Sequence, residues 1–451
     1  MTRVPGGGTC HNGGMDEIAP IRTLGPCRIE SPLRGRARQE GEEARFVDDA
    51  ARVLFDDMAD AMEATLAAGR PLPAFELAGA REHIYFDPTK LRVGIVTCGG
   101  LCPGLNNVIA GLVQELKALY GVTHITGFRN GYQGFIAEYG LDTVDLGAID
   151  VQPLRDMGGT VLGTSRGNQD PERIVDCLER EGIGVLFVIG GDGTMRGAQA
   201  IADIIRTRGL KIAIVCVPKT IDNDIPYIDQ SFGFQTAFAE ASRAIQAGYV
   251  EATASMHGIS LIKLMGRYSG FIASYAALAD TSADVVLIPE VPFSIDGPNG
   301  LLAYIEACLR SKGSAVVVIA EGAGQEHFAE DLGTDASGNR ALADIGSLLR
   351  KRVRAHFDGI GMDIALRYID PSYAIRTVAA NAYDSVYCIQ LAQAAVHAAM
   401  AGKTEVVVGR FRRRFVHLPI PLVVSRTSKV DPEGDLWRSV LENTGQPYRF
   451  D

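Results

Sequence analysis

The stretch "VIGGDGTMRGA", residues 188–198, ends an apolar run in glycines and places one carboxylate, Asp192, among them. The apolar run predicts a buried strand, and "MRGAQAIADIIRT" after it has helical spacing. Backbone N–H groups at a helix start bind anions, and glycines leave those groups open. A carboxylate beside a phosphate needs a bridging cation such as Mg²⁺. The stretch therefore predicts a phosphate and metal site, with Thr194 placed to cap the helix; the alternative is that Asp192 is a helix cap and nothing more.

Units of this kind repeat along the chain. Further apolar, β-branched runs stand at 92–98, 184–190, 211–217, 259–265, 284–290, 314–322 and 405–409, with helical patterns between most of them. Strands that are apolar throughout and alternate with helices predict parallel sheets covered on both faces. Because these units exceed one doubly wound sheet, we predict an α/β fold of two Rossmann-like lobes with mainly parallel sheets. Ligands then bind in a cleft between the lobes, at the carboxyl ends of the strands.

Composition and charge exclude several classes of protein. The chain has 451 residues, of which 47% are hydrophobic, and a formal charge of −10, which argues against a nucleic-acid partner. Its apolar runs are too short to cross a bilayer, and the N-terminus lacks the apolar core of a signal peptide. Eight cysteines in so long a chain do not predict a disulfide framework, so we expect a cytoplasmic protein. Cys98 and Cys102 are interpreted as buried or loop thiols rather than metal ligands.

The N-terminal part differs from the rest. Residues 1–40 are rich in glycine, proline and arginine and predict an irregular or partly ordered extension. From Phe46 to Leu66, apolar residues recur at helical spacing among acids, which predicts an amphipathic helix.

The stretch "VPKTIDNDIP", residues 217–226, also follows a strand. Asp222 and Asp224 are two residues apart, so in extended backbone their carboxylates share a side. Paired acids suit a division between metal binding and acceptance of a hydroxyl proton. Lys219 and Thr220 add a cation and a hydroxyl that suit a phosphoryl group in transfer. The alternative is a turn rich in Asx residues.

Four further junctions carry candidate ligands. "TCGGLCPGLNN" (97–107) is a glycine loop that predicts an anion site, or else only a tight turn. Arg267 in "LMGRYSGFIA" has a planar fork for an anion, and Glu321 in "IAEGAGQ" could accept hydrogen bonds from sugar hydroxyls. Tyr373 and Arg376 are three residues apart on one helix face, which suits a phosphate clamp. For each of these, local packing or solvation is the alternative.

Two common nucleotide motifs are absent from the sequence. The dinucleotide pattern G-x-G-x-x-G fails at Arg196, where the third glycine is required, so a nicotinamide dehydrogenase is excluded. The mononucleotide loop ending at "GKT" (402–404) fails because His397 replaces its first glycine.

Seven motifs in order resemble the 6-phosphofructokinase family over roughly residues 70–445: "CGGLCPGLN", "GTSRG", "GGDGT", "PKTIDND", "MGR", "EGAGQ" and "YIDPSYAIR". "FELAGAREHIYFDP", "LWRSVLENTGQP" and the N-terminal extension are similar to the longer plant and trypanosome type. The resemblance implies Mg²⁺-dependent transfer of a phosphoryl group from ATP to the 1-hydroxyl of fructose 6-phosphate, in glycolysis. It also implies a homo-oligomer, most simply a tetramer.

The resemblance implies roles for individual residues. Asp222 matches the catalytic base, with Lys219, Thr220 and Asp224 as its neighbours in the transfer site, and Asp192 matches the acid of the magnesium site. The positions that match nucleotide contacts are Gly99, Arg166, Gly167, Asp192, Gly193 and Thr194. The positions that match sugar-phosphate contacts are Thr220, Asp222, Met265, Gly266, Arg267, Glu321, Tyr373 and Arg376.

Two positions bear on the phosphoryl donor. Diphosphate-dependent relatives typically carry Asp where this chain has Gly193, and Lys where it has Lys219. An Asp would fill the space that an inner phosphate of a nucleotide needs. The long ATP-dependent members share this mixture, so we predict ATP, with a diphosphate-dependent enzyme as the alternative. A more remote alternative is a catalytically silent regulatory paralogue, against which the intact Asp222, Asp192 and Arg267 argue.

The resemblance also sets the expected domain boundaries. Residues 1–90 form an extension with an amphipathic helix. Residues 91–240, with about 375–405, form the larger, nucleotide-binding lobe. Residues 241–374, with about 406–451, form the smaller, sugar-phosphate-binding lobe.

Overall fold

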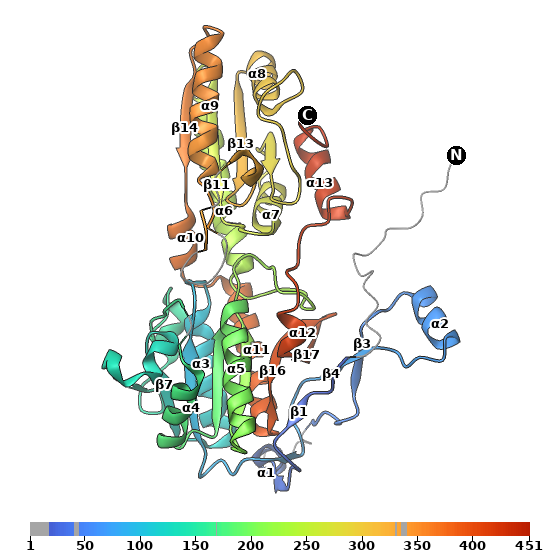
Figure 1. The fold of residues 1–451 in the computed structure, drawn as a ribbon, viewed down its shortest axis with the longest axis vertical. Coiled ribbons are helices and arrows are strands. Elements are labelled where there is room, and N and C mark those ends of the chain that lie inside the picture. Colours follow the sequence, from blue (N-terminus) through green and yellow to red (C-terminus); the bar gives the residue numbers. More distant parts are fainter. Residues whose placement is uncertain (1–17, 40–44, 168, 330–331, 335–340) are drawn as a thin grey trace.

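Two sheets, one in each of two lobes, organise the chain (Figure 1). The structure is a computed structural model, and it describes residues 18–39, 45–167, 169–329, 332–334 and 341–451. The predicted class, α/β with two doubly wound lobes and mainly parallel sheets, is confirmed.

The larger lobe contains, among the described residues, a nine-stranded sheet in the order β3-β4-β17-β16-β10-β9-β6-β7-β8. The five strands from β16 to β7 are parallel, and antiparallel strands extend the sheet on both sides. The strands are β3 (Arg52–Leu54), β4 (Ala74–Leu77), β6 (Arg92–Thr97), β7 (His124–Phe128), β8 (Val144–Asp145), β9 (Val185–Gly190), β10 (Ala213–Pro218), β16 (Val406–Phe411) and β17 (Arg414–Pro419).

Helices cover both faces of this sheet because its central strands are apolar on both sides. Every residue of β9 and β10 is buried. Valines and isoleucines of alternating register pack into two separate cores. One core contains α3 (Leu105–Glu115) and α11 (Ala382–Met400), and the other contains α4 (Pro171–Arg180) and α5 (Asp192–Thr207).

The smaller lobe has a parallel sheet of four described strands in the order β12-β13-β11-β14. These are β11 (Gly258–Leu264), β12 (Val285–Leu287), β13 (Ser314–Ala320) and β14 (Ala365–Ile369). One face packs on α6 (Phe234–Thr253), α7 (Phe271–Ala279) and α13 (Asp435–Thr444). The other packs on α8 (Leu301–Lys312) and α9 (Ile345–Gly359).

The chain changes lobe at three places. It enters the smaller lobe after β10, returns after β14 through α10 (Ser372–Thr377), and enters again after α12 (Ile420–Val423). The carboxyl ends of β6, β9 and β10 therefore face those of β11, β13 and β14 across the junction (Figure 1).

Two predicted domain boundaries are wrong. We expected residues 406–451 in the smaller lobe, but β16 and β17 belong to the larger sheet, where β16 pairs in parallel with β10. The boundary at residue 240 falls inside α6, which packs on the smaller sheet along its length. An apolar strand such as 405–409 fits either sheet by its sequence, so its pattern could not assign it to a lobe.

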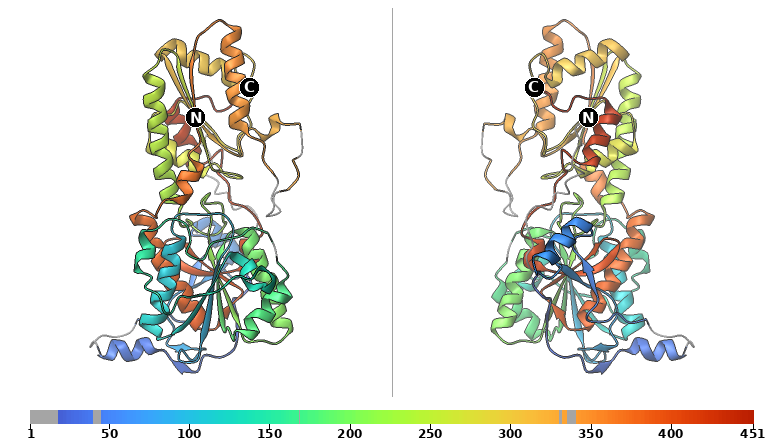
Figure 2. Two further views of the ribbon diagram at one scale, coloured as in Figure 1. Left: turned by 90° about the vertical axis from the view of Figure 1, so that its left-hand side faces the viewer. Right: turned by 90° about the vertical axis from the view of Figure 1, so that its right-hand side faces the viewer.

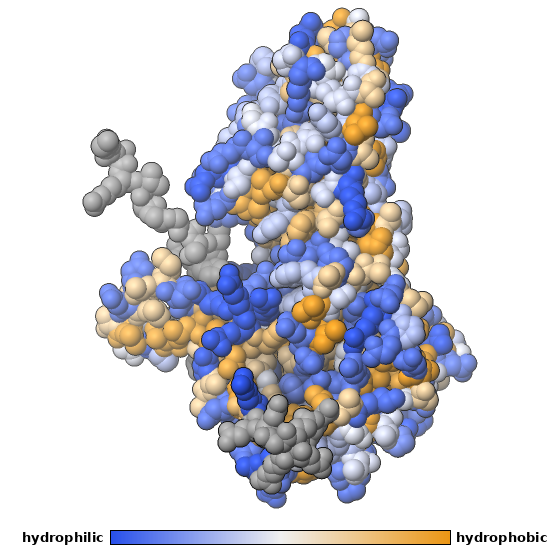
Figure 3. Space-filling model, turned by 180° about the vertical axis from the view of Figure 1, so that it is seen from behind, coloured by the Kyte–Doolittle hydropathy of each residue, from blue (hydrophilic) through white to orange (hydrophobic). Residues whose placement is uncertain are grey.

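The expected amphipathic helix from Phe46 to Leu66 is also wrong in extent. Residues 52–54 form β3, and the helix α2 covers only Ala59–Ala67, with none of its residues buried. Phe55 instead joins an aromatic cluster with Phe75, Phe411 and Tyr227 at the sheet edge. Figure 3 shows the arm that carries α2 projecting from the larger lobe with apolar side chains along it; Leu54, Met58 and Leu66 are exposed.

The rest of the extension lies low on the larger lobe, as the blue segments of Figure 2 show. Residues 1–17 lie outside the described part. The remaining short elements are β1 (Arg22–Thr23) paired with β15 (Lys403–Thr404), β2 (Ile29–Glu30) paired with β5 (His83–Ile84), α1 (Pro32–Gln39), a π turn (Leu116–Tyr120) and 3₁₀ turns at Gly131–Phe135, Ala137–Tyr139, Gln152–Asp156 and Gln325–His327.

In the part of the chain that the structure describes, no helix combines the length and the apolar character that crossing a bilayer requires. The cytoplasmic location stays a prediction.

Candidate active site

A cavity of about 530 Å³ lies between the lobes. It is lined from the larger lobe by the segments that follow β6, β9 and β10, and from the smaller lobe by those that follow β11, β13 and β14. Every residue predicted for the site lines this cavity except Gly266. Gly266 has a φ of 125°, and a Cβ there would lie 2.6 Å from the Ser269 carbonyl oxygen, so it shapes the turn that carries Arg267.

Asp222 is held in place by the segment of the smaller lobe that follows β11. Its Oδ2 atom lies 3.4 Å from the backbone N–H of Arg267, and the Ser269 hydroxyl donates to its carbonyl oxygen at 3.1 Å. Its other carboxylate oxygen, Oδ1, is buried and has no hydrogen-bond partner among the described residues. Burial raises the pKa of Asp222, and the nearby carboxylates of Asp224 and Glu321 raise it further. The carboxylate is thus poised to accept a proton or to face a cation.

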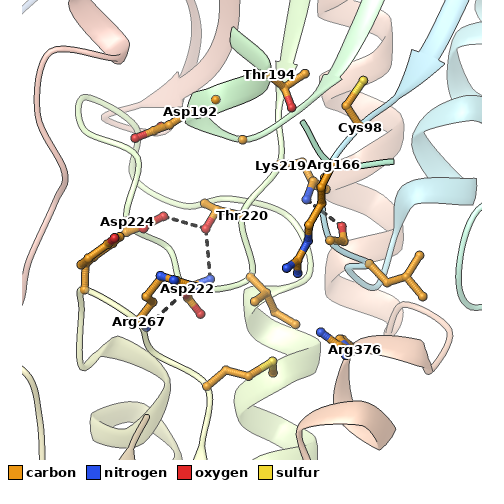
Figure 4. Close-up of a pocket in the computed structure, with 18 of the residues that line it drawn as sticks. Cys98, Arg166, Asp192, Thr194, Lys219, Thr220, Asp222, Asp224, Arg267 and Arg376 are labelled. Carbon is orange, nitrogen blue, oxygen red and sulfur yellow. Dashed lines mark hydrogen bonds between the residues drawn. The ribbon is translucent and has the colours of Figure 1, made fainter. Parts of the chain in front are cut away.

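The neighbours of Asp222 in "PKTIDND" are tied into one loop. The Thr220 hydroxyl donates to Asp224 Oδ1 at 2.6 Å, and the Asp222 N–H donates to Thr220 Oγ1 at 3.2 Å (Figure 4). The left-handed residue Asn223, with a φ of 56°, lies between the two acids, and its side chain accepts from Ser231 N–H at 2.8 Å. The predicted pair of acids is therefore held in a rigid turn that faces the cavity.

Lys219 reaches across to the first glycine loop. Its ammonium donates to the Gly100 carbonyl oxygen at 2.7 Å, and the residue is 7% exposed. Burial lowers the pKa of Lys219. The φ of Gly99 is 85°, and a Cβ there would lie 3.3 Å from the Lys219 ammonium. Glycine at 99 therefore lets the loop and the lysine approach each other.

Asp192 is the first residue of α5. The N-cap residue before it is Gly191, so no side chain caps the start of this helix. Neither Asp192 nor Thr194 is therefore the helix cap that their spacing suggested. The side chain of Thr194 packs over Gly190, where a Cβ would lie 2.4 Å away. Burial raises the pKa of Asp192 to about 6, and the charge of Asp224 contributes to the rise. Asp192 and Asp224, which follow the neighbouring strands β9 and β10, are therefore close enough for their charges to interact.

Cations lie opposite these acids. Figure 4 shows Asp192, Asp222 and Asp224 on one side of the pocket and Arg166 and Lys219 on the other.

The smaller lobe supplies mainly long side chains. Met265 and Arg267 follow β11, Glu321 follows β13, and Tyr373 and Arg376 lie on α10. The Arg376 guanidinium stacks on the Tyr373 ring at 4.3 Å. Burial raises the pKa of Glu321. This side of the cavity is suited to a ligand that carries an anionic group and hydroxyl groups.

The acids fit a divalent cation. Asp192 and Asp224 both have raised pKa values, which a positive ion between them would reverse. Among the described residues, however, no three His, Cys, Asp or Glu side chains gather closely enough to form a metal site of their own. This suits Mg²⁺, which usually takes one or two carboxylates and completes its shell with water and substrate phosphates.

Cys98 and Cys102 are both buried and free, in agreement with their interpretation as thiols. Burial raises the pKa of Cys98 to about 12.

The sequence did not single out Lys263 or Asp370, which also line the cavity. Lys263 Nζ lies 2.9 Å from Asp370 Oδ2. The available signal was a lysine within the apolar run "ISLIKLM", because a charge inside a buried strand requires a partner.

These features define a two-lobed α/β protein with a cleft that brings together acids, cations and glycine loops. Comparisons with known proteins agree. The sequence profile of the family described as Phosphofructokinase matches residues 92–399. A protein of Amycolatopsis methanolica named ATP-dependent 6-phosphofructokinase is 56% identical over 443 residues, which cover 97% of this chain and 96% of that one. ATP-dependent 6-phosphofructokinase 7 of Arabidopsis thaliana is 47% identical over 376 residues, covering 83% and 77%.

The chain belongs to the phosphofructokinase family, and its likeness to the long plant members confirms the type that its motifs predicted. The solved structure of a pyrophosphate-dependent phosphofructokinase from Marinobacter aquaeolei matches with a TM-score of 0.64 and 22% identity, over 78% of this chain and 91% of that one. At that identity the match supports the fold alone.

Proposed function

We propose that the protein transfers a phosphoryl group from ATP to the 1-hydroxyl of fructose 6-phosphate, giving fructose 1,6-bisphosphate and ADP. The observation that carries this is the meeting of Asp222, the Arg267 loop and the Asp192 helix start around one cavity between the lobes. The names of relatives that align over nearly the whole chain support the same activity.

Asp222 is the proposed base. A phosphoryl-transfer transition state is loose, so the enzyme mainly positions the groups and neutralises charge. The raised pKa of Asp222 brings its proton affinity nearer to that of a useful base. The contact with the Arg267 N–H orients one carboxylate oxygen, and the unpartnered oxygen is free to accept the proton of the sugar hydroxyl.

Charge on the transferring group is offset by cations from the larger lobe. Lys219 and Arg166 stand opposite the acids and are placed to face the phosphates. Mg²⁺ would be held by Asp192 and phosphate oxygens, and would supply further positive charge. Gly99, Gly167, Gly193 and Thr194 form the proposed nucleotide side of the cavity.

The sugar phosphate is proposed to lie against the smaller lobe. Arg267 and Arg376 would bind its phosphate, and Glu321 would accept hydrogen bonds from its hydroxyls. Met265 and Tyr373 would contact the sugar, beside Thr220 and Asp222.

Turnover with each donor tests this function. Purified protein with Mg²⁺ and fructose 6-phosphate is expected to form the bisphosphate with ATP and not with diphosphate. Turnover with diphosphate alone would replace ATP as the donor, an alternative that Lys219 favours within the family. No turnover with either donor would support a silent regulatory paralogue.

We also propose that the protein is a homo-oligomer, most simply a tetramer. Large apolar side chains on neighbouring helices support this: Val250 on α6, Tyr275 on α7 and Val386 on α11 are exposed. Analytical ultracentrifugation is expected to give a mass four times that of the chain; a monomer would contradict the proposal.

A further inference from the structure

Lys263 is the one charged residue in the sequence of β11, "GISLIKL". Strand alternation places it on the same face as Ile259 and Leu261, which belong to the core under α8 and α9. A charge at the end of such a face is costly unless it is paired, so its partners identify what it does.

Two carboxylates from different elements pair with this lysine. Lys263 Nζ lies 2.9 Å from Asp370 Oδ2 and 3.8 Å from Asp344 Oδ1, and the lysine side chain is 17% exposed. Asp370 follows β14, the neighbour of β11, and Asp344 caps the start of α9. Burial alone would lower the pKa of Lys263, but its hydrogen bond to Asp370 and the surrounding charges raise that pKa overall. The ammonium group therefore stays charged.

Asp370 in turn holds α10. Its Oδ1 atom accepts hydrogen bonds from the Ser372 N–H at 3.2 Å and from the Ser372 hydroxyl at 2.6 Å. In α10, Ile375 is the one buried residue, so little apolar contact fixes this six-residue helix. Its first turn depends on Asp370, and Asp370 is tied to Lys263.

We propose that Lys263 is a positioning residue for the sugar-phosphate side of the cavity. Through Asp370 it ties α10, which carries Arg376, to β11, which carries the loop with Arg267. Two arginines from separate segments bind one phosphate well only when their spacing is fixed. This proposal rests on the proposed function, because it takes a sugar phosphate as the ligand of those arginines.

A direct contact between Lys263 and the phosphate is the rival explanation, because Lys263 lines the cavity. The two explanations predict different effects of removing the charge of Asp370. If Lys263 positions α10, removing the charge of Asp370 weakens sugar-phosphate binding. If Lys263 binds the phosphate itself, the same change frees the ammonium and leaves that binding equal or stronger.

The test compares Lys263→Met and Asp370→Asn with a matched control, Lys312→Met. Lys312 pairs with Asp284 in the same lobe, away from the cavity. Lys263→Met and Asp370→Asn are each expected to raise the KM for fructose 6-phosphate about tenfold, with kcat changed less than about threefold and the KM for ATP unchanged. The double variant is expected to be no worse than either single variant, and Lys263→Arg to recover most of the loss. Lys312→Met is expected to match the unmodified protein.

Several results would overturn the proposal: an unchanged KM for fructose 6-phosphate in either variant, an equal rise in the KM for ATP, or impairment by Lys263→Met alone. Equilibrium binding of fructose 6-phosphate without nucleotide gives the same comparison independently of turnover. If the unmodified protein binds the sugar phosphate but does not phosphorylate it, the proposed function fails while the positioning role is still decided. Thermal melting of each variant separates loss of fold from loss of spacing.

Discussion

The two lobes present different chemistry to the same cavity although both are parallel sheets covered by helices. The larger lobe contributes the glycine loops at Gly99 and Gly167 and the first turn of α5 at Gly193. The smaller lobe contributes the long side chains of Arg267, Arg376 and others. Asp222 lies on the connection between them, where its N–H donates to the Thr220 hydroxyl oxygen and its carboxylate lies 3.4 Å from the backbone N–H of Arg267 in the smaller lobe.

This difference follows from what each ligand requires. A chain of phosphates is bound well by backbone N–H groups, which need bare backbone around them. A compact sugar phosphate needs a planar, charged fork at a defined distance, which arginine side chains supply. In the proposed function, the larger lobe therefore recognises the nucleotide and the smaller lobe the sugar phosphate, with the base at their junction.

The largest expected effect is at the junction. Asp222→Ser is expected to lower kcat about 10²- to 10⁴-fold, because the hydroxyl proton loses its acceptor, while fructose 6-phosphate still binds. Steady-state kinetics measure the loss of kcat, and calorimetry measures the retained binding of fructose 6-phosphate. Asp229→Ser is a control: this aspartate lies in the same connection but caps the turn at Arg412 and Arg413. Unchanged turnover in Asp222→Ser would remove the base assignment.

A large effect is also expected from the larger lobe alone. Gly193→Asp adds a carboxylate next to Asp192, where an inner phosphate is proposed to lie, and is expected to raise the KM for ATP at least about tenfold. The affinity for fructose 6-phosphate, measured without nucleotide, should stay the same. A variant that uses ATP normally would show that Gly193 does not select the donor.

The next largest expected effect is a shift in the pH dependence of kcat/KM. Because burial, Asp224 and Glu321 raise the pKa of Asp222, its carboxylate becomes protonated and inactive as pH falls through that raised value. The ratio kcat/KM should therefore decline on acidification at a pH well above the ordinary range of Asp, about 4. Asp224→Asn removes one raising charge and should move the inflection to lower pH. An inflection near 4 in the unmodified protein would contradict the burial of this acid.

The smallest expected effect is on stability. Burial raises the pKa of Asp192 in the folded chain to about 6, above its ordinary value of 3.8, so the stabilising contribution of this group is present at low pH and lost as pH rises through about 6. Asp192→Asn in chelator is therefore expected to raise Tm by a few degrees at pH 8 and by less at pH 5. Differential scanning calorimetry measures both values. A lower Tm at pH 8 would mean that Asp192 is stabilised as an anion.

The strands at the centre of each sheet were predictable, because runs such as 184–190 and 211–217 are apolar throughout. The motifs at their ends were also predicted to meet, since parallel strands bring their carboxyl ends to one edge. The sheet that β16 joins was not predictable, because an apolar strand fits either sheet. Lys263 was missed for a related reason: its partner Asp370 is far away in sequence and becomes adjacent only when β11 pairs with β14.

The division between the lobes is tested most directly by measuring the affinities of the Arg267→Met variant for fructose 6-phosphate and for ATP in separate titrations. Loss of this guanidinium from the smaller lobe is predicted to weaken fructose 6-phosphate binding about tenfold or more and to leave ATP binding unchanged. An equal loss of affinity for both ligands would contradict the division, because Arg267 would then serve the nucleotide as much as the sugar phosphate.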